Sequence, residues 1–447
     1  MSTQFNASQV LPISKENKSA SIFVILLLIA SVCKSINPGD KYLVRCNEKL
    51  IEVVMEDLFN PPVASRVYVY PNIAAYEVLC IGHPELNSLS GQIKHLPKLN
   101  LEKVNINFSI ASEFAFTTVA KKLVFSEYMI TSFEAEEKQL WKQSGLDSNL
   151  VNASIQFGVK AGKQLIEWVL KDNYAQVRTM ERYVLREGLA AWRPTAPEYI
   201  NGLEPNWPKM RTLLLDSAYQ IKPLPNVAFS EKKKSAFYKI ALDVYKTSKS
   251  IDTAKKLIAT YWDDNPNVSK SEGHITYFIH KISPGGHWIK ITGQACRNLN
   301  LSELKISEAY ALLTIGMYDG FISCWAEKYR THVLRPETYI NRLIDAKWLP
   351  YIQTPPFPEY TSGHSVVSSV SAYVLTQLLP QPYSFTDSTE TFIGLPPRSY
   401  KSFEAAAAEA GISRFYGGIH YMPAITNGSS QGKQLGKLII QNIKTRK

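Results

Sequence analysis

The chain has 447 residues, of which 45% are hydrophobic, so it is long enough to bury a large core as one domain or two. Its formal net charge is +11, but acidic residues are plentiful and the lysines and arginines are spread along the chain. No nucleic-acid-binding motif accompanies this charge, which argues against a nucleic-acid partner. A solvated basic surface is the ordinary interpretation, and it would also draw an anionic substrate.

The first feature in chain order is an apolar run from Ile22 to Val32, preceded by Lys15 and Lys18 and followed by Cys33. A run of about a dozen residues is short for a membrane span and typical of the core of a signal peptide. We therefore predict that residues 1–36 direct export, which would make the protein periplasmic or tether it to a membrane outside the cytoplasm. Lipidation of Cys33 and an uncleaved membrane anchor are alternatives that the sequence leaves open, as is the oligomeric state.

Most of the remaining chain has helical periodicity, and strand-like alternation is scarce. A segment rich in proline and glycine, 192–208, separates a predicted N-terminal half (37–200) from a second half (201–447). We expect an all-α protein built of helical bundles, with the functional site in the second half. The expected helices are 48–58, 63–78, 111–128, 151–173, 232–248, 251–262, 288–299, 302–329, 365–379, 403–410 and 432–443.

Cysteine and histidine spacing gives little sign of a metal site. No CxxC pair occurs, which argues against zinc. A Cys46–Cys80 disulfide is open in an exported protein, although isolated buried thiols are the default. Six histidines form no pair at i, i+4 and are expected to be structural or on the surface: His83, His95, His274, His280, His287 and His332.

The first segment with candidate chemistry is the end of the helix 302–329. Lys328 and Arg335 are seven residues apart, so they share a face if the helix persists. Pro336 places Arg335 at or near the helix end. Trp325, one turn before Lys328, is either a core residue or part of a pocket rim. Asp319, on the same helix, either pairs with a site cation or is simply buried.

The second segment is a proline-rich loop that contains Phe357 and ends in Ser362, Gly363 and His364. Ser362 could simply cap the apolar helix that follows. Capping does not explain His364, whose imidazole can exchange a proton with a bound group. The free N–H groups of Ser362 and Gly363 at the helix start favour an anion.

The third segment holds Arg414 and His420, separated by five residues that include Gly417 and Gly418. Paired glycines indicate a turn or a close backbone approach that lets the two side chains converge. A lone histidine is more often a satisfied core residue. The three segments together, however, supply three cations and two imidazoles, which suits a tetrahedral oxyanion.

The order and spacing of these segments resemble the signature shared by the type 2 phosphatidic acid phosphatases and the vanadium-dependent haloperoxidases. That signature is Lys, six residues, Arg-Pro; then Ser-Gly-His; then Ser-Arg, five residues, His, and every position is filled here. Thr361 stands where many relatives have proline. Asn206-Trp207 and Gly286-His287-Trp288 are similar to the soluble haloperoxidase-like branch.

The resemblance implies a helical-bundle fold and, in the first interpretation, a haloperoxidase with vanadate as its cofactor and peroxide and halide as its substrates. His420 would be the vanadium ligand, His364 would handle the proton when peroxide binds, and Lys328 could polarise the peroxide. The residues implied to bind the oxyanion are Lys328, Arg335, Ser362, Gly363 and Arg414. Trp325 and Phe357 match aromatic positions near the halide in chloride-oxidising relatives.

In the second interpretation the same residues form an acid phosphatase without a cofactor, which hydrolyses a phosphate monoester. His420 would attack phosphorus to give a phosphohistidine, and His364 would protonate the leaving oxygen. Ala424 stands where many relatives have an acidic residue, which leaves the orientation of His420 unexplained and disfavours this mechanism. The two aromatic positions and the lack of further spanning segments favour the haloperoxidase. A non-catalytic oxyanion-binding protein is the third alternative.

Overall fold

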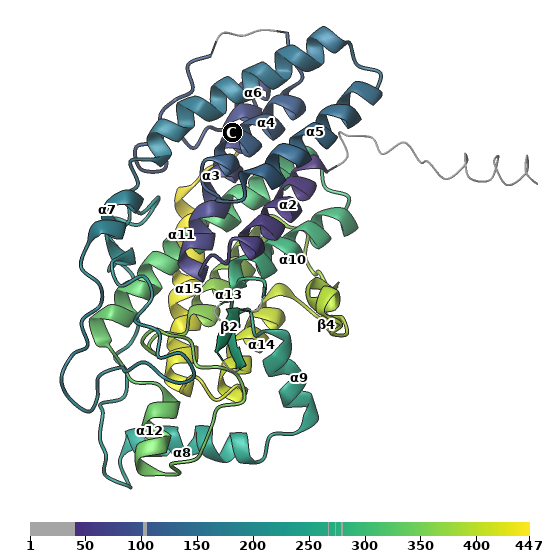
Figure 1. The fold of residues 1–447 in the computed structure, drawn as a ribbon. Helices are drawn as coiled ribbons and strands as arrows, with labels where there is room; N and C mark the ends of the chain where they lie inside the picture. The colour runs from purple at the N-terminus through teal and green to yellow at the C-terminus, as the bar shows by residue number, and fades with distance from the viewer. Residues whose placement is uncertain (1–40, 102–104, 267, 273, 279) are drawn as a thin grey trace, which may run out of the picture.

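The computed structural model describes residues 41–101, 105–266, 268–272, 274–278 and 280–447. The predicted export segment and Cys33 lie outside these residues. Among the helices that the structure describes, each is too short or too polar to cross a lipid bilayer. The body is elongated, with α4, α5 and α6 at one end and α8 and α12 at the other (Figure 1).

The N-terminal helices are α2 (Tyr42–Glu56), α3 (Pro61–Gly82), α4 (Phe108–Lys121), α5 (Glu127–Gln143) and α6 (Ser148–Val169). Capping side chains set several of their starts. The Asn60 side chain accepts from the Val63 N–H ahead of α3, and Asp147 does the same for the first turn of α6. Helices α4 and α6 touch at backbone level, because a Cβ on Gly158 would lie 2.2 Å from the Ala111 carbonyl oxygen.

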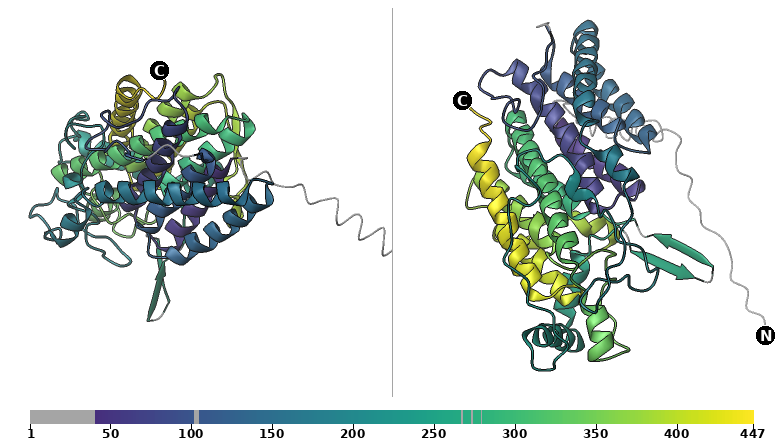
Figure 2. Two further views of the ribbon diagram at one scale, coloured as in Figure 1. Left: turned by 90° about the horizontal axis from the view of Figure 1, so that it is seen from above. Right: turned by 90° about the vertical axis from the view of Figure 1, so that its left-hand side faces the viewer.

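The middle of the chain is more irregular. It contains α7 (Tyr174–Thr179), the short 3₁₀ helix η1 (Trp207–Lys209), α8 (Ala236–Lys249), α9 (Thr253–Tyr261) and α10 (Pro284–Asn298). Strands β1 (Ser269–Glu272) and β2 (Ile275–Phe278) pair antiparallel and project from the helical body (Figure 2).

The C-terminal part is organised around α11 (Glu303–Thr331), which packs against α3 on one side and α13 (Gly363–Leu378) on the other. The remaining elements are α12 (Pro336–Leu343), β3 (Phe385–Asp387), η2 (Thr389–Ile393), β4 (Arg398–Tyr400), α14 (Phe403–Tyr416) and α15 (Met422–Asn442). Helix α13 packs on both α14 and α15, so its N-terminus lies among the segments that carry the candidate site.

The all-α fold class predicted from the sequence is confirmed, since helices build the body and the strands form two small hairpins. One predicted helix is wrong, and three helices were not predicted. Residues 111–128 form no single helix, because α4 ends at Lys121 and α5 begins at Glu127. Helix α5 as a whole, α7 and α12 were not expected. The possible disulfide is not formed: Cys46 and Cys80 are free thiols on α2 and α3.

Candidate oxyanion site

The three segments singled out in the sequence meet at the C-terminal end of α11. Lys328 comes from α11, Arg335 from the residue before α12, and His364 from the first turn of α13. Arg414 lies in the last turn of α14, and His420 follows the turn at Gly418, whose φ of +81° favours glycine. We call the site formed by Lys328, Arg335, Ser362, Gly363, His364, Arg414 and His420 the cradle.

Lys328 and Arg335 do not share a helix face, because the condition for it, a helix that persists to Arg335, is not met. Helix α11 ends at Thr331, and His332 adopts a left-handed conformation with φ 50° that turns the chain. The His332 ring points away from the cradle and its Nδ1 lies 2.8 Å from the Tyr183 hydroxyl. Arg335 therefore returns to Lys328 through this turn, and the seven-residue spacing does not reflect helical geometry.

Lys328 is fully buried and its ammonium group is held by backbone. Its Nζ donates to the carbonyl oxygens of Pro358 (2.9 Å), Glu359 (3.1 Å) and Thr361 (2.5 Å). Burial, together with the charge of Arg335, lowers the pKa of Lys328 to about 7. Three carbonyl acceptors around one nitrogen suit the protonated form, and a bound anion would stabilise it further.

His420 is oriented by a carboxylate that the sequence analysis did not identify. Its Nδ1 lies 2.8 Å from Glu359 Oε1, which also accepts the Tyr421 N–H at 3.0 Å. Because the carboxylate requires a proton on Nδ1, the lone pair is on Nε2, where Arg335 Nη1 donates to it at 3.1 Å. Nε2 is thus the unprotonated nitrogen, which would bond a central atom in place of its hydrogen bond from Arg335.

Glu359 thereby supplies the acid that is missing at position 424. Burial raises the pKa of Glu359 to about 7, while the charges of Arg335 and Lys328 oppose that rise. Burial, with the nearby cations, also holds the pKa of His420 well below its ordinary value, so the ring is neutral. The only sign of this in the sequence is that position 424 is alanine where many relatives have an acidic residue, so that a carboxylate from elsewhere in the chain has to orient His420.

Arg335 and Arg414 present unpaired donors to the site. Arg335 is bonded through Nε to the Phe357 carbonyl at 2.9 Å, but its Nη2 has no hydrogen-bond partner. Arg414 donates from Nη1 to the Trp262 carbonyl at 2.6 Å, and its Nε and Nη2 have none. Its nearest counter-charge is Asp263, 3.7 Å from Nη2. Buried guanidinium donors without acceptors are costly unless an anion completes them.

The start of α13 contributes differently from what the sequence suggested. The Ser362 side chain caps α13 by accepting from Ser365 N–H at 3.3 Å. The Ser362 N–H donates to the Ala424 carbonyl at 3.1 Å, so in this structure it already has an acceptor other than an anion. Gly363, the first residue of α13, retains an N–H that no preceding helical turn can satisfy.

His364 has a free ring nitrogen inside the cradle. Its Nε2 has no hydrogen-bond partner and lies 3.8 Å from Asp264 Oδ2, which is also unpaired. Burial and the charge of Arg414 lower the pKa of His364 well below its ordinary value. A neutral imidazole at this place can accept a proton.

The cradle opens on a small cavity of about 20 Å³. The Trp325 and Phe357 rings form part of its wall, with centroids 4.9 Å apart, so the structure brings both predicted pocket residues to the cradle. His364, Arg414 and His420 also line it. A cavity needs about 10–15 Å³ to hold one water, so the enclosed space beside the cradle is small.

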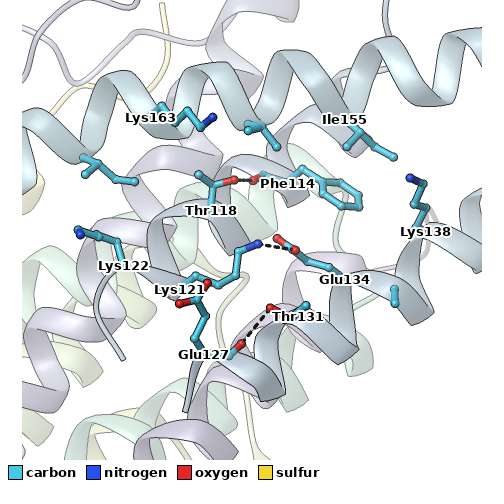
Figure 3. A pocket seen from close by; sticks show the side chains of 13 residues that line it. Phe114, Thr118, Lys121, Lys122, Glu127, Thr131, Glu134, Lys138, Ile155 and Lys163 are labelled. Carbon is cyan, nitrogen blue, oxygen red and sulfur yellow. Dashed lines mark hydrogen bonds and ion pairs between the residues drawn. The ribbon is translucent and has the colours of Figure 1, made fainter. Parts of the chain in front are cut away.

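A much larger cavity, of about 750 Å³, lies elsewhere, between α4, α5 and α6 (Figure 3). It is lined by lysines and apolar side chains, with Lys121 paired to Glu134 at 2.6 Å. No cradle residue and no histidine lines it. Choosing the candidate site by cavity volume alone would therefore miss the cradle.

Asp319 and His287 have partners outside the cradle. Asp319 pairs with no cradle cation, because its carboxylate accepts the N–H groups of Leu213, Leu214 and Leu215 at 2.8–3.0 Å. His287, expected to be structural or on the surface, is buried between carboxylates behind the cradle. Its partners Asp264 and Asp387 could not be identified from spacing.

Comparison with known proteins identifies relatives of this chain. The family model for the VCPO second helical-bundle domain matches residues 308–446. A bacterial vanadium-dependent iodoperoxidase structure shares 41% identity over 92% of this chain and 98% of its own, with a TM-score of 0.87. A holo-type bacterial vanadium-dependent chloroperoxidase is 13% identical over 90% of this chain and 97% of its own, with a TM-score of 0.65, which shows a common fold. No curated protein matches the chain.

Proposed function

This chain belongs to the vanadium-dependent haloperoxidases, and from that premise we propose that it oxidises iodide with hydrogen peroxide at a vanadate held in the cradle. The observation that carries the choice of iodide is the 41% identity to a bacterial vanadium-dependent iodoperoxidase, 98% of which this chain covers. The likeness to the chloroperoxidase, at 13% identity, supports the fold and not the halide.

The cradle residues fit vanadate. Arg335 Nη2 and Arg414 Nε and Nη2 are buried donors without acceptors, and oxyanion oxygens would satisfy them. His420 Nε2 has its lone pair free of a proton, which suits it as the vanadium ligand. When bound, vanadate supplies the Lewis acid that activates hydrogen peroxide for attack by a halide.

The protein contributes charge, orientation and a proton acceptor. Arg335, Arg414 and Lys328 neutralise negative charge in a site from which water is largely excluded. Glu359 fixes the tautomer and ring plane of His420. His364, neutral and with Nε2 unpaired, can take the proton that hydrogen peroxide releases on binding.

The halide would approach along the aromatic wall. Trp325 Nε1 donates to the Leu203 carbonyl at 3.2 Å, which fixes the indole, and its ring packs on Phe357. Lys328 Nζ lies 5.6 Å and 5.1 Å from the centroids of these two rings. A polarisable anion such as iodide would contact the two aromatic rings that line the cavity, with the buried charge of Lys328 close to both rings.

The test is a paired assay on the full chain, prepared free of vanadate and then titrated with orthovanadate. We expect peroxide-dependent oxidation of iodide, faster than that of bromide or chloride, which requires vanadate and disappears in His420→Ala. His280→Ala, a histidine exposed on another face, serves as the matched control and should retain activity.

The same preparation is offered p-nitrophenyl phosphate without vanadate. Efficient ester hydrolysis that vanadate inhibits, with no halide oxidation, would make the protein an acid phosphatase and refute the proposal. We expect the opposite result, halide oxidation without efficient ester hydrolysis.

We also propose that the protein is exported, and either periplasmic or tethered through its N-terminus. The support is the sequence pattern alone: Lys15 and Lys18, then the apolar run before Cys33. N-terminal analysis of the mature protein from cell fractions tests this. An intact Met1 in the cytoplasmic fraction would contradict it.

A further inference from the structure

A buried cluster of ionisable residues lies directly behind the cradle. His287 on α10 is surrounded by Asp264, Asp387 at the end of β3, and Glu390 in η2. All four are buried, with exposed fractions of 0–4%. The haloperoxidase chemistry described above does not use His287, Asp387 or Glu390.

The imidazole of His287 faces carboxylates through both nitrogens. Nε2 lies 2.8 Å from Asp387 Oδ2, and Nδ1 lies 3.0 Å from Asp264 Oδ1 and 3.8 Å from Glu390 Oε1. A neutral imidazole carries one N–H. If Nε2–H donates to Asp387, the Nδ1 lone pair points at the oxygens of Asp264 and Glu390, and a cation is required among these three atoms.

The cluster leaves two buried carboxylate oxygens unsatisfied. Glu390 Oε1 and Asp264 Oδ2 have no hydrogen-bond partner, and Glu390 Oε1 lies 3.8 Å from His287 Nδ1. The nearby Lys281 is paired with Asp263 at 2.5 Å and donates to neither oxygen.

The spacing of the three atoms suits a metal. One nitrogen or oxygen atom from each of Asp264, His287 and Glu390 lies within 4.8 Å of the other two. Ligands about 2.0–2.1 Å from a tetrahedral zinc ion are about 3.3 Å apart, and the observed separations from Nδ1 are 3.0 and 3.8 Å. Asp387 would then be the outer carboxylate that orients a metal-bound histidine.

We propose that Asp264, His287 and Glu390 bind a divalent first-row transition metal of the zinc or manganese class, at a site separate from that of vanadate. One imidazole with two carboxylates favours these ions over calcium, which takes six to eight oxygen ligands. Asp264 Oδ2 faces His364 Nε2 at 3.8 Å, so the metal would fix the carboxylate behind the proton-accepting histidine.

The first measurement is elemental analysis of the full chain, as purified and after unfolding and refolding with zinc, because a buried site fills as the chain folds. We expect about one zinc per chain after refolding. Glu390→Gln, which keeps the size of the side chain, should lose most of it. Glu337→Gln is the matched control, since Glu337 is equally buried but bonded to Thr354 outside the cluster.

Circular dichroism and vanadate titration show whether each variant is folded with its cradle intact. If Glu390→Gln fails to fold, refolding wild-type protein with cobalt(II) provides a second measurement, because absorption bands of cobalt bound by nitrogen and oxygen ligands report the site directly. Wild-type protein that refolds without binding zinc or cobalt would overturn the proposal and leave protons as the balancing charge. Equal zinc content in wild type and Glu390→Gln would overturn it too.

Discussion

Replacing Glu359 by glutamine tests whether this carboxylate sets the properties of His420. In the structure Glu359 Oε1 accepts both the His420 Nδ1–H at 2.8 Å and the Tyr421 N–H at 3.0 Å. A glutamine oxygen can accept the same two hydrogen bonds, so the substitution removes the charge and retains the shape. Both the tautomer and the ring position of His420 should therefore survive.

The magnitude follows from the hydrogen bond that is weakened. A bond to a charged group contributes about 1.5–3 kcal/mol and a neutral one about 0.5–1.5 kcal/mol, so roughly 1–2 kcal/mol is lost. Since about 1.4 kcal/mol is tenfold in affinity, vanadate should bind about 5- to 30-fold more weakly. Removing the negative charge of Glu359 also reduces its repulsion of the vanadate anion, which would strengthen binding. Removing a carboxylate that orients a metal-binding histidine nevertheless typically weakens metal affinity by about 10- to 100-fold.

The assay is calorimetric titration of vanadate-free protein with orthovanadate at pH 8, because burial raises the pKa of Glu359 to about 7 and the group is then mostly ionised. Glu337→Gln is the control for a buried carboxylate outside the cradle. Unchanged or tighter binding in Glu359→Gln would refute the reasoning and show that the electrostatic repulsion dominates. Glu359→Ala should be worse, because it also leaves the Tyr421 N–H unpaired.

Three further outcomes are expected. Burial lowers the pKa of Lys328 to about 7, and a bound anion favours the protonated form. Vanadate affinity should therefore fall by up to about tenfold per pH unit above pH 7. Lys328→Met should flatten this pH dependence in the same titration. A Cβ on Gly432 would lie 2.1 Å from the Val366 carbonyl oxygen, so Gly432→Ala should reduce the free energy of unfolding by about 1–3 kcal/mol. Gly320→Ala should not reduce it, because a Cβ there would lie 3.5 Å from its nearest neighbour. Urea denaturation of both variants checks this, and equal stabilities would contradict it. Ser362→Ala should lose about 1 kcal/mol through the missing cap of α13, and Ser362→Gly only a few tenths, as measured in the same denaturation experiment.

The candidate cradle could be predicted from sequence because its residues lie in three short segments with fixed internal spacing. The ordered set from Lys328 to His420 was enough to indicate an oxyanion site and a family. Its internal geometry was not predictable. Lys328 and Arg335 would share a face only on a continuous helix, but α11 ends before the left-handed residue His332, and the turn there brings Arg335 to the cradle.

The sequence by itself determined the helical class, the approximate course of most helices and the candidates for anion binding, because apolar periodicity and motif spacing are local properties of a chain. Only the tertiary structure decided which carboxylate orients His420, since Glu359 is separated from it by 61 residues. It also decided that His287 meets Asp387, 100 residues away. Such pairs form where segments distant in sequence pack together, and this packing depends on the shapes of whole surfaces, which no local pattern encodes.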